Sequence, residues 1–394
     1  MTNLPVPAGQ PARERELPEL GAADALHARS DRRAFLRHAS ALTLAIPGLG
    51  AALAACSSED QAREGGGSAQ PHPPQTTAGY DSSRLHNPDS KLDTALHQAI
   101  PHPLATVPTA NAAVAPFARY DPALPPLSTQ RTIDVHFHAR HMPIRISPDS
   151  VVAGWTFDGN IPGPVVHCRV GDTVRFTLTN EMDVPHSMDF HAARIDPRTA
   201  FRSALKGDSV SYAFTPRYAG AFLYHCGTAP VLMHLGSGMY GAIVVSPREP
   251  LPRAREFVLV HSEFYLGAGN NGVRPFDYQR MLSELPDIVV FNGRPDQYTQ
   301  APIRVRTGER VRFWVVNAGP TLSCAFHVVG QQFDTVYLGA PPASAIHGVQ
   351  TFAVAAGGGM GFELMADIPG EFPFVNHEFG HGQKGATGYM VVES

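Results

Sequence analysis

Residues 223–239 read LYHCGTAPVLMHLGSGM, and the rest of the chain can be interpreted from them. The segment predicts a strand that runs into a loop at Cys226, with His234 eight positions later and Met239 five positions after that. A thiolate, an imidazole and a weak thioether together suit copper in an electron-transfer site. Such a site needs a second imidazole from upstream, and His186, within VPHSMDFH (residues 184–191), is the candidate.

Strand geometry predicts a second metal site beside the first. Successive side chains on a strand point to opposite faces, so if Cys226 faces one metal, His225 faces away from it. His191 is five residues from His186, an odd offset, and can also leave the first site. Asp189 shares a strand face with His191. We therefore expect two metal sites joined through His225 and Cys226, with a carboxylate beside the second.

Composition favours a turn-rich β protein. The chain has 394 residues, of which 36 are Gly and 36 are Pro, and charged residues make up 17% against the usual quarter. The net charge of -4 gives no indication of a nucleic-acid partner.

The N-terminus has the features of an export signal. Arg32 and Arg33 resemble a twin-arginine motif, and an apolar run follows over residues 41–55. Cys56 ends a segment that resembles a lipoprotein processing box. Residues 1–56 therefore predict export to the periplasm or another extracytoplasmic location, with Cys56 as the lipidated anchor. The alternative is a plain signal peptide with an incidental cysteine.

A linker follows the signal. Residues 57–130 include the run GGGS at 65–68 and an Ala- and Pro-rich part over 101–126, which predict a poorly ordered linker and an extended arm along the folded body.

From residue 131 the sequence repeats itself. RVGDTVRF at 169–176 recurs as RTGERVRF at 306–313, 137 positions later, and Gly220-Ala221-Phe222 recurs as Gly370-Glu371-Phe372. The duplication predicts an all-β protein of two tandem β-sandwich domains, residues 131–247 and 248–394. Strand-like runs include 303–317 and 348–366, and one helix is expected around residues 276–285.

The two copies differ chemically. Counting from the matched glycines places Asn376 where the first copy has Cys226, so the second domain should hold no thiolate site. It offers His377 and His327, which we expect to complete the second metal site from a different domain.

Other cysteines and histidines have simpler interpretations. Cys168 and Cys324 are expected to be buried free thiols, with a disulfide left open. In VHFHARH (135–141), His136 and His138 share a strand face, and a surface or inter-strand placement is favoured over a metal site for this group, which also includes His141. No role is expected for His381.

These motifs resemble the copper-containing nitrite reductases, in particular their shorter-loop class. The resemblance covers roughly residues 150–394 and is carried by YHC at 224–226 through Met239, WTFDG at 155–159, HSMDFHAA at 186–193, VVFNG at 289–293, and VNH at 375–377 with KGA at 384–386. It implies two cupredoxin-like Greek-key domains and two coppers per chain. The implied type 1 ligands are His186, Cys226, His234 and Met239, and the implied type 2 ligands are His191 and His225, with His377 from a neighbouring chain of a homotrimer.

The resemblance also implies a reaction. An electron from a small donor protein, a cupredoxin or a cytochrome c type, would enter at type 1 copper and pass through Cys226 and His225 to type 2 copper, where nitrite is reduced to nitric oxide. Asp189 and His327 occupy the positions of the family's catalytic residues. One segment departs from the pattern: this class carries a glycine-rich loop where this chain reads RIDPRT at 194–199.

Two other functions are compatible with parts of the sequence. A multicopper oxidase acting on oxygen would need several His-x-His pairs, and among the segments considered only His136 and His138 form one. A non-enzymatic copper electron-transfer protein would need the first site alone, which leaves His191, His377, Asp189 and His327 without a role.

Overall fold

The computed structural model describes residues 113–394. The predicted export signal, Cys56 and the linker up to residue 112 lie outside these residues. Within the described part of the chain, no helix is both long and apolar enough to cross a membrane.

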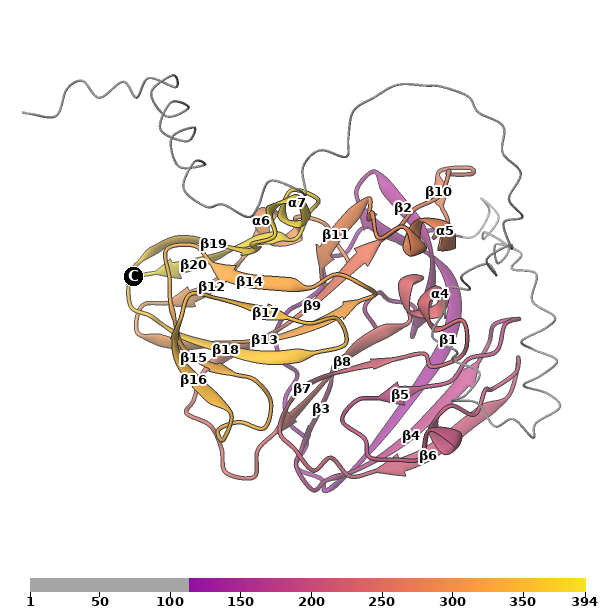
Figure 1. Cartoon of the computed structure of the whole chain (residues 1–394), viewed down its shortest axis with the longest axis horizontal. Helices are drawn as coiled ribbons and strands as arrows, with labels where there is room; N and C mark the ends of the chain where they lie inside the picture. The colour runs from indigo at the N-terminus through magenta and orange to yellow at the C-terminus, as the bar shows by residue number, and fades with distance from the viewer. Residues whose placement is uncertain (1–112) are drawn as a thin grey trace, which may run out of the picture. The chain divides into compact units, whose positions relative to one another are not determined.

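The first half is built from short strands and two short helices, in the order that Figure 1 displays. They are β1 (Thr132–Ser147), β2 (Ser150–Phe157), β3 (Val166–Arg169), β4 (Thr173–Asn180), β5 (Asp189–Phe190), α3 (Pro197–Ala200), β6 (Ser209–Phe214), β7 (Gly220–His225), α4 (Val231–Gly236) and β8 (Tyr240–Ser246).

The second half is also built from strands and short helices, and it has more strands than the first half. Its elements are β9 (Arg255–Phe264), β10 (Val273–Arg274), α5 (Tyr278–Leu282), β11 (Ile288–Phe291), α6 (Gln297–Gln300), β12 (Ala301–Arg306), β13 (Glu309–Gly319), β14 (Cys324–Val328), β15 (Phe333–Tyr337), β16 (Ala345–Val349), β17 (Thr351–Val354), β18 (Gly359–Ala366), β19 (Gly370–Asn376), α7 (Phe379–Gly382) and β20 (Thr387–Glu393).

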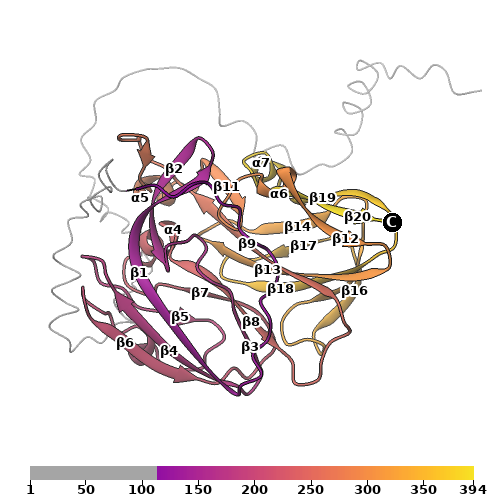
Figure 2. The same cartoon turned by 180° about the vertical axis from the view of Figure 1, so that it is seen from behind.

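These strands form four sheets, two in each half. The first half has the orders β10-β2-β1-β4-β6 and β3-β8-β7-β5, and the second has β11-β9-β13-β18-β15-β16 and β12-β20-β19-β14-β17. Figure 2 shows β1, the longest strand, running along the first half. The all-β prediction is confirmed. The boundary at 247/248 stays a prediction, because β10 belongs to the second range but pairs with β2.

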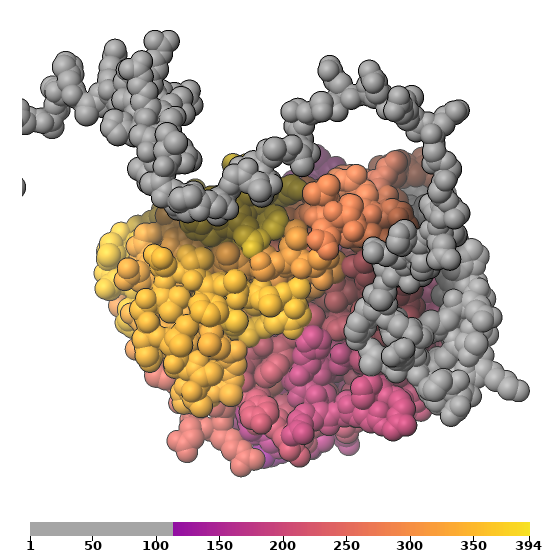
Figure 3. Space-filling model, in the orientation of Figure 1, coloured from indigo at the N-terminus to yellow at the C-terminus, as the bar shows by residue number. Residues whose placement is uncertain are grey.

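The period-2 alternation of the central strands creates three hydrophobic cores. On β7, Tyr224 enters the core of the first half, whereas Leu223 enters a core between the halves. On β13, Phe313 enters the core of the second half, and Trp314 enters the shared one. Strands buried on both faces therefore join the two sandwiches, and Figure 3 shows the magenta surface of the first half beside the orange and yellow surface of the second.

Residues 113–126 lie across both halves. The hydroxyl of Tyr120 donates to the carbonyl of Gly163 at 3.0 Å, and its backbone N–H donates to the side chain of Gln297 at 2.8 Å. Ala123 forms an isolated bridge with Phe257. This arm therefore ties the halves together without adding a regular strand.

The duplication extends to buried asparagines. Asn180 accepts from the N–H of Met182 and donates to the carbonyl of Val184, at 2.8 and 2.7 Å. Asn317 accepts from Gly319 and donates to Leu322, at 2.9 and 2.8 Å. Each asparagine thereby fixes the loop that leads to the next strand of its half.

Element boundaries differ from the expectation where glycines reverse the chain. The run 303–317 is two strands, β12 and β13, because Gly308 adopts a φ of 85° in the turn between them. The run 348–366 likewise divides into β17 and β18, and β16 begins before it. The expected helix is present as α5, and Asp277 caps it by accepting from the backbone N–H of Gln279.

Asn292 provides a test of the connection between β11 and β9. It has a φ of 54°, is fully buried, accepts from the N–H of Val260 at 2.7 Å and donates to the carbonyl of Val258 at 2.9 Å. Asn292→Ala should lower the free energy of unfolding by about 3 kcal/mol, since a buried N–H loses its partner and Ala resists the left-handed region. Urea unfolding measures this loss.

Asn271 is the matched control for this prediction. It has a similar φ of 49° but is exposed, so Asn271→Ala removes only the backbone preference. We expect a loss of about 1 kcal/mol there. Equal losses for the two variants would show that the hydrogen bonds of Asn292 contribute nothing.

Candidate metal centres

The first cluster, called centre 1, consists of His186, Cys226 and His234. Cys226 directly follows β7, His234 lies in α4, and His186 precedes β5. The Cys226 Sγ atom is 3.6 Å from His186 Nδ1 and 3.3 Å from His234 Nδ1, and the two nitrogens are 3.1 Å apart. All three side chains are buried, so the cluster has no direct access to water.

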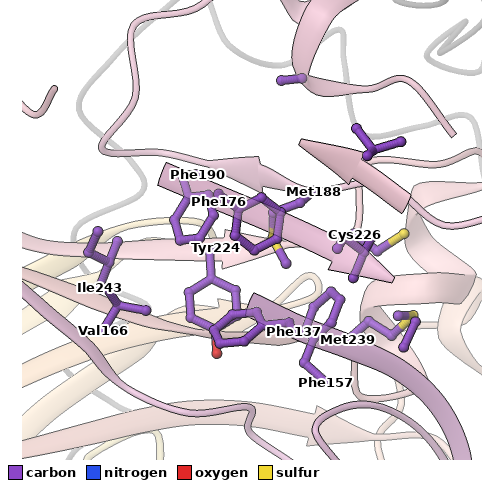
Figure 4. Close-up of a cluster of buried hydrophobic side chains, with 14 of the residues drawn as sticks. Phe137, Phe157, Val166, Phe176, Met188, Phe190, Tyr224, Cys226, Met239 and Ile243 are labelled. Atoms are coloured by element: carbon purple, nitrogen blue, oxygen red, sulfur yellow. The ribbon is translucent and has the colours of Figure 1, made fainter. Parts of the chain in front are cut away.

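The geometry of centre 1 fits a metal ion. A triangle with these sides contains a point about 2 Å from all three atoms, which matches metal–nitrogen bonds in proteins. Met239 is also fully buried, and its carbonyl accepts from the N–H of Cys226 at 3.0 Å. Figure 4 shows the side chains of Cys226 and Met239 toward the same end of the aromatic core that includes Phe137 and Phe157. The donor set of two imidazoles, a thiolate and a nearby thioether suits copper.

Electrostatics prepare the same atoms as ligands. Burial, with His234 as a second cause, holds the pKa of His186 well below its ordinary value, so the imidazole is neutral. Burial raises the pKa of the Cys226 thiol, while the backbone N–H groups of Ser187 and Thr228 act in the opposite direction by favouring the thiolate. A bound cation would complete the deprotonation that these two N–H groups assist.

The second cluster, called centre 2, consists of Asp189, His191 and His225. Asp189 on β5 pairs with His225 on β7. The Nε2 atoms of His191 and His225 are 3.1 Å apart, and the Oδ2 atom of Asp189 lies 3.8 and 3.7 Å from them. Burial, followed by His191, lowers the pKa of His225, whereas Asp189 raises it.

Hydrogen bonds set the tautomers of both histidines in centre 2. His191 Nδ1 is 3.0 Å from the carbonyl of Gly357, and His225 Nδ1 is 2.8 Å from the carbonyl of Cys226. A carbonyl accepts only from N–H, so each Nδ1 carries the proton and each Nε2 presents a lone pair. Two lone pairs at that distance repel one another unless a cation lies between them, so these imidazoles also fit a metal.

His225 and Cys226 are consecutive but belong to different centres. Cys226 faces His186 and His234, while His225 faces His191 and Asp189. The two clusters expected from strand alternation are therefore both present, and one dipeptide joins them.

His377 and His327 lie apart from centre 2 within one chain. Their rings are 5.2 Å from each other, but neither belongs to the two clusters of ligand atoms found in residues 113–394. His327 Nδ1 is 2.6 Å from the carbonyl of Gln350, which leaves Nε2 free for other chemistry. A surface pocket of about 480 Å³ adjoins His327 and is lined by His327, Gly330, Gln331, Gln332, Asp334, Gln350, Met365 and Asp367.

The remaining cysteines and histidines match their simpler interpretations. Cys168 and Cys324 are buried free thiols. The rings of His136 and His138 stack on an outer face of β1, where His136 contacts Thr179 and His138 contacts Glu181. His141 lines a small cavity with Trp155 and Met233.

The departing loop 194–199 contains most of α3. Asp196 caps α3 by accepting from the N–H of Arg198. The segment just beyond it covers centre 1: Ala204 exchanges two backbone hydrogen bonds with His186, and the ring of Phe201 packs against Gly227. A different loop sequence at 194–199 is thus compatible with the same ligand cluster.

Sequence reasoning missed Gly357, whose contribution is a backbone carbonyl and leaves no signal in side-chain chemistry. Gly357 has a φ of 79°, which turns the loop before β18 toward His191, but this conformation is known only from the structure.

An all-β chain with buried sulfur and imidazole ligands defines a cupredoxin-type metalloprotein, and residues 140–250 match the family described as Multicopper oxidase. The chain is 40% identical over 248 residues to the copper-containing nitrite reductase of Neisseria meningitidis, covering 61% of this chain and 64% of that protein. It is 30% identical over 277 residues to that of Cereibacter sphaeroides, covering 64% and 73%. A solved copper nitrite reductase from Nitrosomonas europaea has a TM-score of 0.63 at 35% identity, covering 67% of this chain and 94% of that one.

The chain therefore belongs to the copper-containing nitrite reductase family, and copper is the metal that this family indicates. The predicted fold of two tandem cupredoxin-like domains agrees with these neighbours. The chain spans 64% of the length of the Neisseria meningitidis relative.

Centre 1 leads to a test with a visible signal. Cys226→Ala should abolish the strong visible absorption of a copper–thiolate site, while Cys168→Ala and Cys324→Ala, which remove equally buried thiols, should keep it. Absorption spectra of the copper-loaded variants measure this difference. Retained colour in Cys226→Ala would contradict the assignment of the thiolate.

Proposed function

We propose that the protein reduces nitrite to nitric oxide with two coppers per chain. Type 1 copper would be held by His186, Cys226, His234 and Met239, and type 2 copper by His191, His225 and His377. The observation that carries the proposal is the direct peptide link between the two ligand clusters at His225 and Cys226. A simple electron carrier has no need of a second cluster one residue away.

The reaction consumes one electron and two protons per nitrite and releases nitric oxide and water. When bound, copper at centre 1 would exchange single electrons, and copper at centre 2 would act as a Lewis acid toward nitrite. Cys226 and His225 supply a covalent route between the centres, and the 2.8 Å contact between His225 Nδ1 and the Cys226 carbonyl shortens it. Burial of Cys226 keeps water away from this route.

Asp189 is the proposed proton donor. Its Oδ2 atom lies within 3.8 Å of both Nε2 atoms of centre 2, so a ligand bound there would meet the carboxyl group. His327 is the proposed second member of the relay, because the Gln350 carbonyl holds its Nδ1–H and leaves Nε2 to exchange protons.

The proposed assembly is a homotrimer, and the position of His377 supports a centre shared between copies. Centre 2 has two imidazoles within one chain, and His377 lies with His327 elsewhere in that chain. A neighbouring copy is therefore the proposed source of the third imidazole. The type 2 centre, and access to the proton relay through His327, would then form only on assembly.

Reduction of oxygen is the second candidate, and the match of residues 140–250 to the multicopper oxidase family favours it. A cluster of several coppers needs many imidazoles, yet the described residues contain two groups of three ligand atoms, and one of these includes Asp189. Parallel assays of nitrite and oxygen consumption with an artificial donor discriminate the two activities.

Delivery and partners complete the proposal. The twin-arginine motif would export the folded protein, Cys56 would carry a lipid anchor, and the electron donor would be a small cupredoxin or cytochrome c type protein. The Neisseria meningitidis and Nitrosomonas europaea relatives named as nitrite reductases support nitrite as the substrate.

Asp189→Asn tests the proton donor. The variant should keep the colour and both coppers but lose nitrite turnover by a factor of about 100 or more, as for a lost general acid. Turnover of the native protein should also fall as pH rises, because each cycle consumes two protons. Asp183→Asn, at a side chain 82% exposed and paired with Lys206, is the control and should stay active. Near-native turnover of copper-loaded Asp189→Asn would make this carboxylate structural.

Subunit complementation tests the shared centre. His191→Ala and His377→Ala should each abolish nitrite reduction, but co-expression should recover part of it, since mixed trimers contain centres with all three imidazoles. Turnover per copper measures the recovery, and a co-expressed pair that both carry His377→Ala is the control. Equal inactivity of the two mixtures would mean that His377 does not serve a neighbour.

A further inference from the structure

The second half repeats the hydrogen-bond frame of centre 1 around Asn376. The N–H of Cys226 donates to the carbonyl of Met239, and the N–H of Asn376 donates to the carbonyl of Ala386, both at 3.0 Å. On the neighbouring strands, Asp189 pairs with the residue before Cys226, and His327 pairs with the residue before Asn376. Cys226 and Asn376 are therefore structural equivalents, and so are Asp189 and His327.

The two N–H groups that favour the Cys226 thiolate also have counterparts. Those groups belong to Ser187 and Thr228. In the second half, the Oδ1 atom of Asn376 accepts from the N–H of Ala325 and of Glu378, each at 3.1 Å. Like Thr228 after Cys226, Glu378 comes two residues after Asn376. The amide oxygen thus takes the hydrogen bonds that a sulfur receives in the first half.

The amide nitrogen of Asn376 extends this hydrogen-bond network into the place that corresponds to the metal position of centre 1. It is 3.2 Å from His261 Nε2 and 3.3 Å from His381 Nδ1, close to the 3.3 Å between Cys226 Sγ and His234 Nδ1. His261 Nδ1 donates to Asn317, so its Nε2 can accept from the amide. Cys324 is the equivalent of His186, and Ala386 is the equivalent of Met239. The position around Asn376 therefore lacks the set of copper ligands present at centre 1.

This hydrogen-bond network includes the residues on both sides of His377. Asn376 and Glu378 flank it in sequence, and its own N–H donates to the carbonyl of Ala325 at 2.7 Å. The Glu378 carboxylate accepts from the hydroxyl of Ser323 and lies 2.7 Å from His381 Nδ1. These hydrogen bonds hold residues 376–378 against residues 323–325 at the start of the adjoining strand.

The imidazole of His377 has no such support of its own. Within residues 113–394 it makes ring contacts but no hydrogen bond: its centroid is 4.4 Å from the ring of Phe379 and 5.2 Å from that of His327. His191 and His225, by contrast, each donate Nδ1–H to a backbone carbonyl. Phe379 is 59% exposed, so its ring covers one side of His377 without being part of a core.

We propose that Asn376 and Phe379 are positioning residues for His377, and that the thiolate position of the second half serves to hold a ligand for the neighbouring subunit's centre 2. Asn376 fixes the backbone on either side of His377, and Phe379 restricts its ring. The inference rests on the proposed role of His377 as a type 2 copper ligand.

The test is copper affinity at centre 2, measured by titrating copper-loaded trimers with a chelator and following the electron paramagnetic resonance signal of the type 2 ion. Asn376→Ala and Phe379→Ala should weaken this copper by about 10- to 100-fold and alter its hyperfine splitting, as loss of outer contacts does. The colour of centre 1 should not change. Asn376→Asp keeps an acceptor for both N–H groups and should recover most of the affinity.

Matched controls separate positioning from stability. Val392→Ala removes a buried side chain of the same half, beside Gly370 at the far end of β19 from Asn376, and Ile368→Ala removes an apolar side chain with a similar exposure of 56%. Both should keep native affinity for the type 2 ion. Native affinity in both Asn376→Ala and Phe379→Ala overturns the inference, as does an equal loss in the controls. If Asn376→Ala fails to fold, Phe379→Ala decides alone, because an exposed ring is not needed for folding.

His377→Ala distinguishes failure of this inference from failure of the proposed function. Loss of type 2 copper in His377→Ala, with native affinity in the positioning variants, rejects only the positioning role. Retention of type 2 copper in His377→Ala rejects the ligand assignment on which the inference depends.

Discussion

The peptide bond between His225 and Cys226, at the end of β7, is the constraint on which both centres depend. Strand alternation sends the two side chains to opposite faces, so neighbouring residues belong to different clusters of candidate ligands without any additional element. The same alternation buries both faces of β7, with Tyr224 in one core and Leu223 in another. Displacing the strand would therefore disturb two cores and two centres together, which explains why so much of the structure packs against it.

Duplication explains how a second metal site could arise without a second thiolate. The halves share a frame of buried asparagine, strand pairing and loop, as Asn180 and Asn317 illustrate. What differs is the side chain inside that frame: Cys226 in one half, Asn376 in the other. A carboxamide donates as well as accepts, so it can fill the position by donating to His261 Nε2 and accepting from two backbone N–H groups instead of binding a cation. The frame is then free to hold the adjacent His377.

Sequence analysis predicted those parts of the molecule in which chemistry is local. Strand alternation and ligand types identified both clusters. The strand Phe333–Tyr337 was not predicted, because its partners on β18 and β16 are remote and its own pattern is short. The carbonyl of Gly357 was missed because backbone groups carry no identity. No role was expected for His381, because its contacts with Asn376 and Glu378 appear only in the folded structure.

The duplication also accounts for the fact that the two proposed proton-relay residues belong to different halves. Asp189 and His327 occupy equivalent positions, each paired with the residue before the thiolate position of its own half. In the first half that neighbour is His225, a member of centre 2, and in the second it is Val375, which has no metal-binding group. The proposed ligand of the second half lies on the other side of Asn376, at His377. In the proposed assembly, this shift would let the duplicated strands present different groups to a shared centre: a carboxylate and two imidazoles from one half, and two imidazoles from the other.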